Sequence, residues 1–165
     1  MKEMREKLKE LGSQKRHEFI GEFVRLGYKN SFRTFRATLM LANVKLVEDD
    51  ELVTDHLWFN YTKSFLKLGE LEEGDLIKFN ARVDGYDKGY IVADTHDYRL
   101  VNPSKIKLVN NKITRQPMPI DNNAAMIGYA MKKNKQFYKE NHRSYIQWYV
   151  DCYEYWLKQL NSNNG

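Results

Sequence analysis

The 165-residue sequence has one cysteine, three prolines and no apolar run long enough to cross a membrane. The single Cys152 excludes an intramolecular disulfide and a zinc site built from several cysteines. A membrane-spanning helix needs about 18 predominantly apolar residues, and the residues that follow Met1 are charged instead. We therefore expect a cytoplasmic protein that has no membrane partner.

Catalytic motifs are also absent. The sequence contains no Gly-rich phosphate loop, no nucleophile elbow, no Cys/His spacing for a metal and no convincing pair of carboxylates. His96 stands between Asp94 and Asp97, but one histidine without a second motif does not define a metal or acid–base site. We expect no enzyme, metal or cofactor, while carboxylates that converge from distant loops keep an enzyme as an alternative.

Charge is distributed unevenly along the chain. Residues 19–104 hold eleven Lys/Arg and fourteen Asp/Glu, whereas residues 105–165 hold ten and four. The acidic run at residues 48–51 would repel phosphate. If the protein holds a polyanion, its basic ends are expected to share the contacts.

The clearest structural signal is the stretch from Leu71 to Val83. It opens with a turn in which Gly74 can take a positive φ. Alternation follows, which predicts a half-buried strand with Ile77, Phe79, Ala81 and Val83 on one face and Leu76, Lys78, Asn80 and Arg82 on the other. Residues 84–89 predict a turn, and residues 90–93 predict a returning strand.

Three strands are expected before this stretch, at residues 17–28, 33–47 and 55–61, with a short helix at 62–69. In the first strand, Arg25 shares its parity with Phe23. In the third strand, Leu57 is expected to face the core, so Trp58 lies on the opposite side. There Trp58 either points outward to solvent or packs under the terminal helices. The last strand lies within residues 90–109, where Pro103 is expected to break it.

Helices are expected at both ends of the chain. Residues 1–11 predict a charged helix that ends at Gly12. The alternative for this end of the chain is a nucleic-acid arm built from Lys7, Lys9, Lys15 and Arg16. Residues 110–123 read as a linker, and helices are expected at about 124–139 and 143–160. The second of these carries an aromatic stripe that predicts packing against the first helix and the sheet, or against a second copy of the chain.

The order of three strands, a short helix and two strands resembles the OB-fold, and the Leu71–Val83 phrase resembles the entry into the fourth strand of such domains. The resemblance covers residues 17–109, and Ala81 stands where those domains often have glycine. The chain also resembles small proteins of phages and mobile elements of Gram-positive bacteria. This would place it in the cytoplasm of a bacterial or phage-infected cell.

The resemblance implies a mainly β fold with flanking helices: a five-stranded OB-like Greek-key barrel, an N-terminal helix and a C-terminal two-helix extension. The implied organisation is a helix at residues 1–16, the barrel at 17–109, a linker at 110–123 and a basic, aromatic helical hairpin at 124–165. OB-folds often bind oligonucleotides.

Two functions follow as expectations. The first is non-catalytic binding of single-stranded DNA or RNA, with aromatic rings stacking on bases and cations contacting phosphates through Arg25, Tyr28, Lys29, Arg33, Arg36, Trp58, Lys78, Arg82, Lys132, Lys133 and Lys135. The second is a protein-interaction module that forms a homodimer or binds a host protein, for example as an inhibitor of a host nucleic-acid enzyme such as a CRISPR nuclease. Its contacts would come from Tyr145, Trp148 and Trp156.

Overall fold

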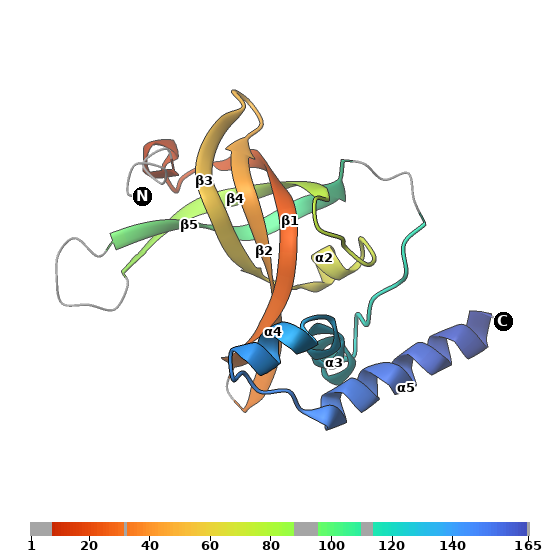
Figure 1. The fold of residues 1–165 in the computed structure, drawn as a ribbon. Coiled ribbons are helices and arrows are strands. Elements are labelled where there is room, and N and C mark those ends of the chain that lie inside the picture. Colours follow the sequence, from red (N-terminus) through yellow and green to blue (C-terminus); the bar gives the residue numbers. More distant parts are fainter. Residues whose placement is uncertain (1–7, 32, 88–95, 110–113, 165) are drawn as a thin grey trace. The chain divides into compact units, whose positions relative to one another are not determined.

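The computed structural model describes residues 8–31, 33–87, 96–109 and 114–164. Its labelled elements, shown in Figure 1, are β1 (Arg16–Ser31), β2 (Thr34–Leu46), β3 (Glu51–Asn60), α2 (Lys63–Leu66), β4 (Leu76–Asp87), β5 (His96–Leu108), α3 (Asn123–Lys133), α4 (Lys135–Glu140) and α5 (Gln147–Asn164). The strands form one antiparallel sheet in the order β3-β2-β1-β4-β5. The predicted mainly β fold with flanking helices is confirmed.

The chain divides into two compact units. The first contains Met1–Arg25, Met40–Trp58 and Leu71–Thr114, and the second contains Leu26–Leu39, Phe59–Glu70 and Arg115–Gly165. All of β4 and β5 belong to the first unit, while α2, α3, α4 and α5 belong to the second. The first three strands contribute residues to both units.

Alternation along β4 builds the core of the first unit. The predicted inward set is confirmed: Ile77, Phe79 and Ala81 are fully buried. Phe79 lies opposite Phe19 of β1 in the strand register, and their rings stack with centroids 5.9 Å apart. Burying two phenylalanine side chains contributes several kcal/mol of hydrophobic free energy, at about 1.5–3 kcal/mol each.

Two glycines at turns adopt the backbone that only glycine takes without strain. Gly74 has a φ of +97° and its amide donates to the carbonyl of Phe23 over 2.9 Å, which confirms the predicted turn before β4. Gly12 has a φ of +75° and ends a helical turn at residues 8–11. The rest of the predicted N-terminal helix lies outside the described residues.

The β4–β5 pair is longer than the sequence predicts. Residues 84–87, expected in a turn, continue β4 and pair with residues 96–99 of β5. Pro103 does not end β5; instead the register shifts near it, between Asn80 and Arg82 of the partner strand, as at a β-bulge. In the described register β1 accompanies β4 only as far as Arg82, so residues 83–87 pair with β5 alone.

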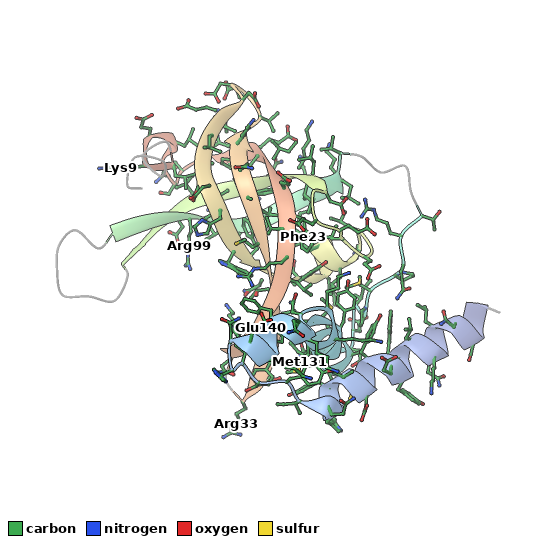
Figure 2. The ribbon with its side chains drawn as sticks, viewed as in Figure 1. Lys9, Phe23, Arg33, Arg99, Met131 and Glu140 are labelled. Atoms are coloured by element: carbon green, nitrogen blue, oxygen red, sulfur yellow. The ribbon has the colours of Figure 1, made fainter. Side chains whose placement is uncertain are left out.

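Helix α3 forms the centre of the second unit. Its residues from Ala125 to Met131 are buried, and Met131 lies among the helices in Figure 2. Tyr129 donates its hydroxyl proton to Oε2 of Glu70 over 2.7 Å. Burial, together with this carboxylate, raises the pKa of Tyr129 far above its ordinary value. The phenol therefore stays a neutral donor at physiological pH.

The predicted first C-terminal helix is two helices rather than one. Asn134 separates α3 from α4, with a φ of −109° and a ψ of +23°. Its side-chain amide donates to the backbone carbonyl of Leu26 over 2.7 Å. A tertiary hydrogen bond thus fixes asparagine, a poor helix former, outside helical geometry. The expected two-helix extension is corrected to α3, α4 and α5.

Helices α3 and α5 lie side by side (Figure 1), and their backbones meet at Gly128. A β-carbon at this position would lie 1.9 Å from the backbone carbonyl oxygen of Tyr149 and 3.0 Å from Cβ of Tyr153. Only glycine allows this approach, because backbone atoms cannot rotate away as side chains do. The packing of α5 on α3 depends on this contact.

We predict that Gly128→Ala destabilises the protein by about 1–3 kcal/mol, the usual cost of overpacking. Alanine is the better helix former, so a loss of stability would reflect the clash alone. Chemical denaturation followed by circular dichroism measures the change. The control is Lys133→Ala, on an exposed position of the same helix, which is expected to stay within about 0.5 kcal/mol of the wild type. Equal stability of Gly128→Ala and wild type would contradict the close approach.

Candidate nucleic-acid interface

Trp58 lies on the solvent-facing side of β3. Its neighbour Leu57 is 4% exposed, whereas Trp58 is 45% exposed. Successive side chains of a strand point to opposite faces, so the buried Leu57 fixes the outward direction of Trp58. This is one of the two orientations that the sequence leaves open. We call the solvent-facing side of the sheet in the first unit the outer face.

Arg25 of β1 reaches the same aromatic ring. Its guanidinium carbon lies 5.4 Å from the centroid of Trp58, within the distance of a cation–π contact. In a regular strand Arg25 would share the inward side with Phe23, as its parity predicts. Phe23 and Leu26 are three positions apart and are both buried. Regular alternation would bury positions an even number of residues apart, so the alternation changes between them. This change brings Arg25 to the outer face.

Like charges face each other across two strand pairs of the first unit. Arg82 of β4 lies opposite Arg16 of β1, and Lys78 of β4 lies opposite Lys107 of β5. Directly opposed residues of an antiparallel pair point to the same side, and like charges there are destabilising. Lys78 and Arg82 alternate with the buried Phe79 and therefore belong to the outer face. The face thus gathers cations at a cost in stability.

The side chain of Arg16 is held by hydrogen bonds to residues of β4 and β5. Its Nη2 donates to the carbonyl of Asn80 over 2.9 Å and to Oγ of Ser104 over 2.8 Å. Two carboxylates, Glu18 and Glu22, follow Arg16 with the same parity on β1. The outer face is therefore a set of basic pairs beside acidic neighbours and not a uniformly positive surface.

Tyr28, a predicted stacking residue, lies in the core of the second unit. It is 6% exposed, and its hydroxyl donates to the backbone carbonyl of Ser144. The guanidinium of Arg143 lies 5.4 Å from its ring centroid. Burial raises the pKa of Tyr28, and the neighbouring Arg143 opposes that rise. We do not retain Tyr28 as a surface for bases.

The remaining predicted cations belong to the second unit and are exposed: Lys29, Arg33, Arg36, Lys132, Lys133 and Lys135. Arg33 lies at the β1–β2 connection, with its side chain pointing away from the neighbouring elements in Figure 2. Lys132 forms an ion pair with Glu154. Lys135 lies over the ring of Tyr145, 5.4 Å from the centroid. These two lysines are thus engaged with neighbouring side chains.

The aromatic stripe of α5 is divided between packing and exposure. Trp156 is half-buried and stacks on Tyr153 with centroids 6.0 Å apart. Trp148 is 61% exposed and Tyr155 is 67% exposed. The predicted partner residues Tyr145, Trp148 and Trp156 therefore differ in exposure. Tyr155 belongs to the predicted aromatic stripe but not to the three partner residues selected from it, although it lies seven positions from Trp148 on the same helical side.

Lys107 is another residue that sequence reasoning did not select, whereas Arg16 enters it only as part of the alternative N-terminal nucleic-acid arm. Lys107 belongs to an alternating run before Val109, which is a signal of an exposed strand position. Arg16 precedes the predicted first strand and has no such signal. Its importance depends on the register with β4, which the sequence does not specify.

Other kinds of site find no support in the part of the chain that the structure describes. There, no group of three or more His, Cys, Asp or Glu side chains is arranged to hold a metal ion. No described helix combines the length and the apolar character needed to span a membrane. Comparisons of the chain with protein families, curated proteins and solved structures found no match.

We predict that Lys107→Gln stabilises the protein by about 0.2–1 kcal/mol at low ionic strength, because it relieves the repulsion with Lys78. The gain should shrink as salt is added, since ions screen exposed charges. Urea denaturation at two salt concentrations measures both effects. Lys105→Gln is the matched control, because Lys105 lies on the same strand without a like-charged partner in the described register. A Lys107→Gln protein no more stable than this control would refute the repulsive pair.

Proposed function

We propose that the protein binds single-stranded DNA or RNA on the outer face, without catalysis. The observation that carries this proposal is the exposed Trp58 with the Arg25 guanidinium at its ring. Proteins that bind single strands combine aromatic rings, on which bases stack, with cations that neutralise the backbone. Arg25 covers one face of the indole with a positive charge and leaves the other face for a base.

The like-charged pairs support the same ligand. Lys78 opposite Lys107, and Arg16 opposite Arg82, lower the stability of the free protein. A phosphate backbone bound beside them would replace this repulsion with attraction and release counterions. The destabilising arrangement in the free protein is therefore favourable in the complex that we propose.

Residues 19–104 contain more acidic than basic side chains. This excess argues against a polyanion ligand only if the carboxylates of these residues lie on the outer face. Four of them form the run at residues 48–51, which covers the end of the β2–β3 connection and the first residue of β3. Asp50 there has a φ of +57°, as in a turn. Local charge within about 10 Å, and not the sum over the domain, acts on a bound strand at physiological salt.

We further propose that the sheet is an OB-like Greek-key barrel. The neighbours β4-β1-β2-β3 follow the strand order of a Greek key. The short helix α2 stands between β3 and β4, as in the OB arrangement that the sequence resembles. In OB-folds the face of the second and third strands binds oligonucleotides, and β3 carries Trp58.

Fluorescence anisotropy with short labelled DNA and RNA oligonucleotides at two salt concentrations tests the proposal. We expect Trp58→Ala to weaken binding about 5- to 150-fold, which corresponds to about 1–3 kcal/mol for one stacked base. Trp58→Phe should retain most of the affinity. Lys78→Gln should lower the salt dependence by about 0.7 in the slope of log affinity against log salt.

Trp148→Ala is the matched control, since it removes another exposed tryptophan, from α5 in the second unit. It is expected to leave oligonucleotide affinity unchanged. Absence of binding to either kind of strand at low salt, by a folded wild-type protein, would eliminate the proposal.

Protein binding through α5 is the second candidate, favoured by the exposed rings of Trp148 and Tyr155. Large apolar side chains left in water on one helical side are typical of interaction surfaces. If a second copy of the chain is the partner, sedimentation should show a dimer that Trp148→Ala combined with Tyr155→Ala converts to a monomer. Trp58→Ala should leave that dimer intact. A monomer at all concentrations would remove the homodimer.

A further inference from the structure

A cavity of about 300 Å³ lies within the second unit. Its lining comes from the start of β2, the passage from the end of β3 into α2, residues 119–123 and α3. Small-molecule sites are about 300–1,000 Å³ in volume, mostly apolar and fitted with a few polar groups. The cavity is at the lower end of this range and suits one small group.

Part of the cavity wall is apolar and fixed by packing, beside a comparable polar part. Tyr61, Leu66 and Met126 line it and are buried. The ring of Tyr61 packs edge-on against Phe65, with centroids 6.3 Å apart. A flat apolar ligand would gain hydrophobic free energy against these walls without first rearranging them.

Two solvent-exposed polar side chains stand at the same cavity. Among the described residues, the side-chain amide of Asn60 and the hydroxyl of Thr62 make no hydrogen bond. Thr62 precedes α2 but does not cap it with its side chain. An asparagine amide offers a donor and an acceptor side by side, which matches the edge of a nucleobase.

Two cations complete the lining. Arg36 and Lys63 contribute positive charge, and Lys63 forms an ion pair with Asp121 over 2.6 Å. The lining thus holds two cations and one carboxylate. It combines an apolar wall, an exposed amide and these charged groups.

We propose that this cavity binds one nucleobase together with its phosphate. The base would lie against Tyr61, Leu66 and Met126 with its edge at Asn60, and the phosphate would lie near Lys63. Recognition of single strands commonly uses bases splayed out of the stack into such pockets. The inference rests on the proposed function for its choice of ligand class, but it uses none of the residues of the outer face.

The same chemistry could be supplied by a free nucleotide or by one nucleotide of a strand. Two-dimensional NMR of the ¹⁵N-labelled protein, with the side-chain amide of Asn60 as the probe, separates these sources. Nucleoside 5′-monophosphates, short oligonucleotides and inorganic phosphate are added in separate titrations. We expect nucleotides or oligonucleotides to shift the Asn60 amide signals, and phosphate alone to leave them in place.

Substitutions then test the contacts. Asn60→Ala should weaken binding of the mononucleotide about 3- to 10-fold, the size of one or two lost hydrogen bonds. Asn161→Ala, an exposed asparagine of α5 in the same unit, is the control and should have no effect. Lys63→Ala should reduce the preference for a nucleotide over its nucleoside, because the nucleoside has no phosphate.

Each result has a defined meaning. Shifts caused by mononucleotides support the cavity as a free-nucleotide site, and shifts caused only by oligonucleotides support it as a subsite for a strand. Unchanged Asn60 signals, or the same shifts with phosphate alone, would overturn the inference. Oligonucleotide binding that depends on Trp58 but leaves Asn60 unshifted would retain the proposed function and reject the cavity. Binding of mononucleotides in the cavity without any oligonucleotide binding would retain the cavity as a nucleotide site and reject the proposed single-strand binding.

Discussion

The register between β1 and β4 is the constraint on which the first unit depends. It places Phe19 opposite Phe79, and their stacked rings form the core. A slip of one residue would turn Phe79 toward water and carry Lys78 and Arg82 into the interior. Burying unpaired charges is far costlier than exposing apolar side chains. The apolar core and the basic outer face are therefore two results of one pairing.

The sequence predicts these features where its pattern is strictly alternating. The buried side of β4 follows from alternation, and the turn at Gly74 follows from its glycine. Alternation places Trp58 opposite in direction to Leu57 but leaves open whether its ring is exposed or covered. The position of Arg25 does not follow from alternation, because β1 has bulky residues on both sides and changes its alternation after Phe23. The pair of Lys78 and Lys107 depends on a strand register with irregularities, which composition alone does not encode.

Long-range contacts account for the remaining differences. Helical periodicity continues through Asn134, but the bond from its amide to Leu26, more than one hundred residues away, divides the helix. Tyr28 stands in a stretch that reads as a loop, and its ring is buried by contacts with Tyr138 and Arg143. Neither outcome has a local signal, because both depend on which distant segment supplies the partner. The cavity beside Asn60 is likewise assembled from three separate stretches of the chain.

The extension of β4 and β5 beyond Arg82 has a separate consequence for the architecture. Residues 84–87, which follow the buried Val83, are paired on one side only, and a two-stranded ribbon by itself is marginally stable in water. The ribbon can therefore bend, lengthen or accept an inserted peptide without loosening the stacked phenylalanines. It is the natural place on this chain to graft a fluorophore or an affinity tag, and a segment whose length evolution could vary freely.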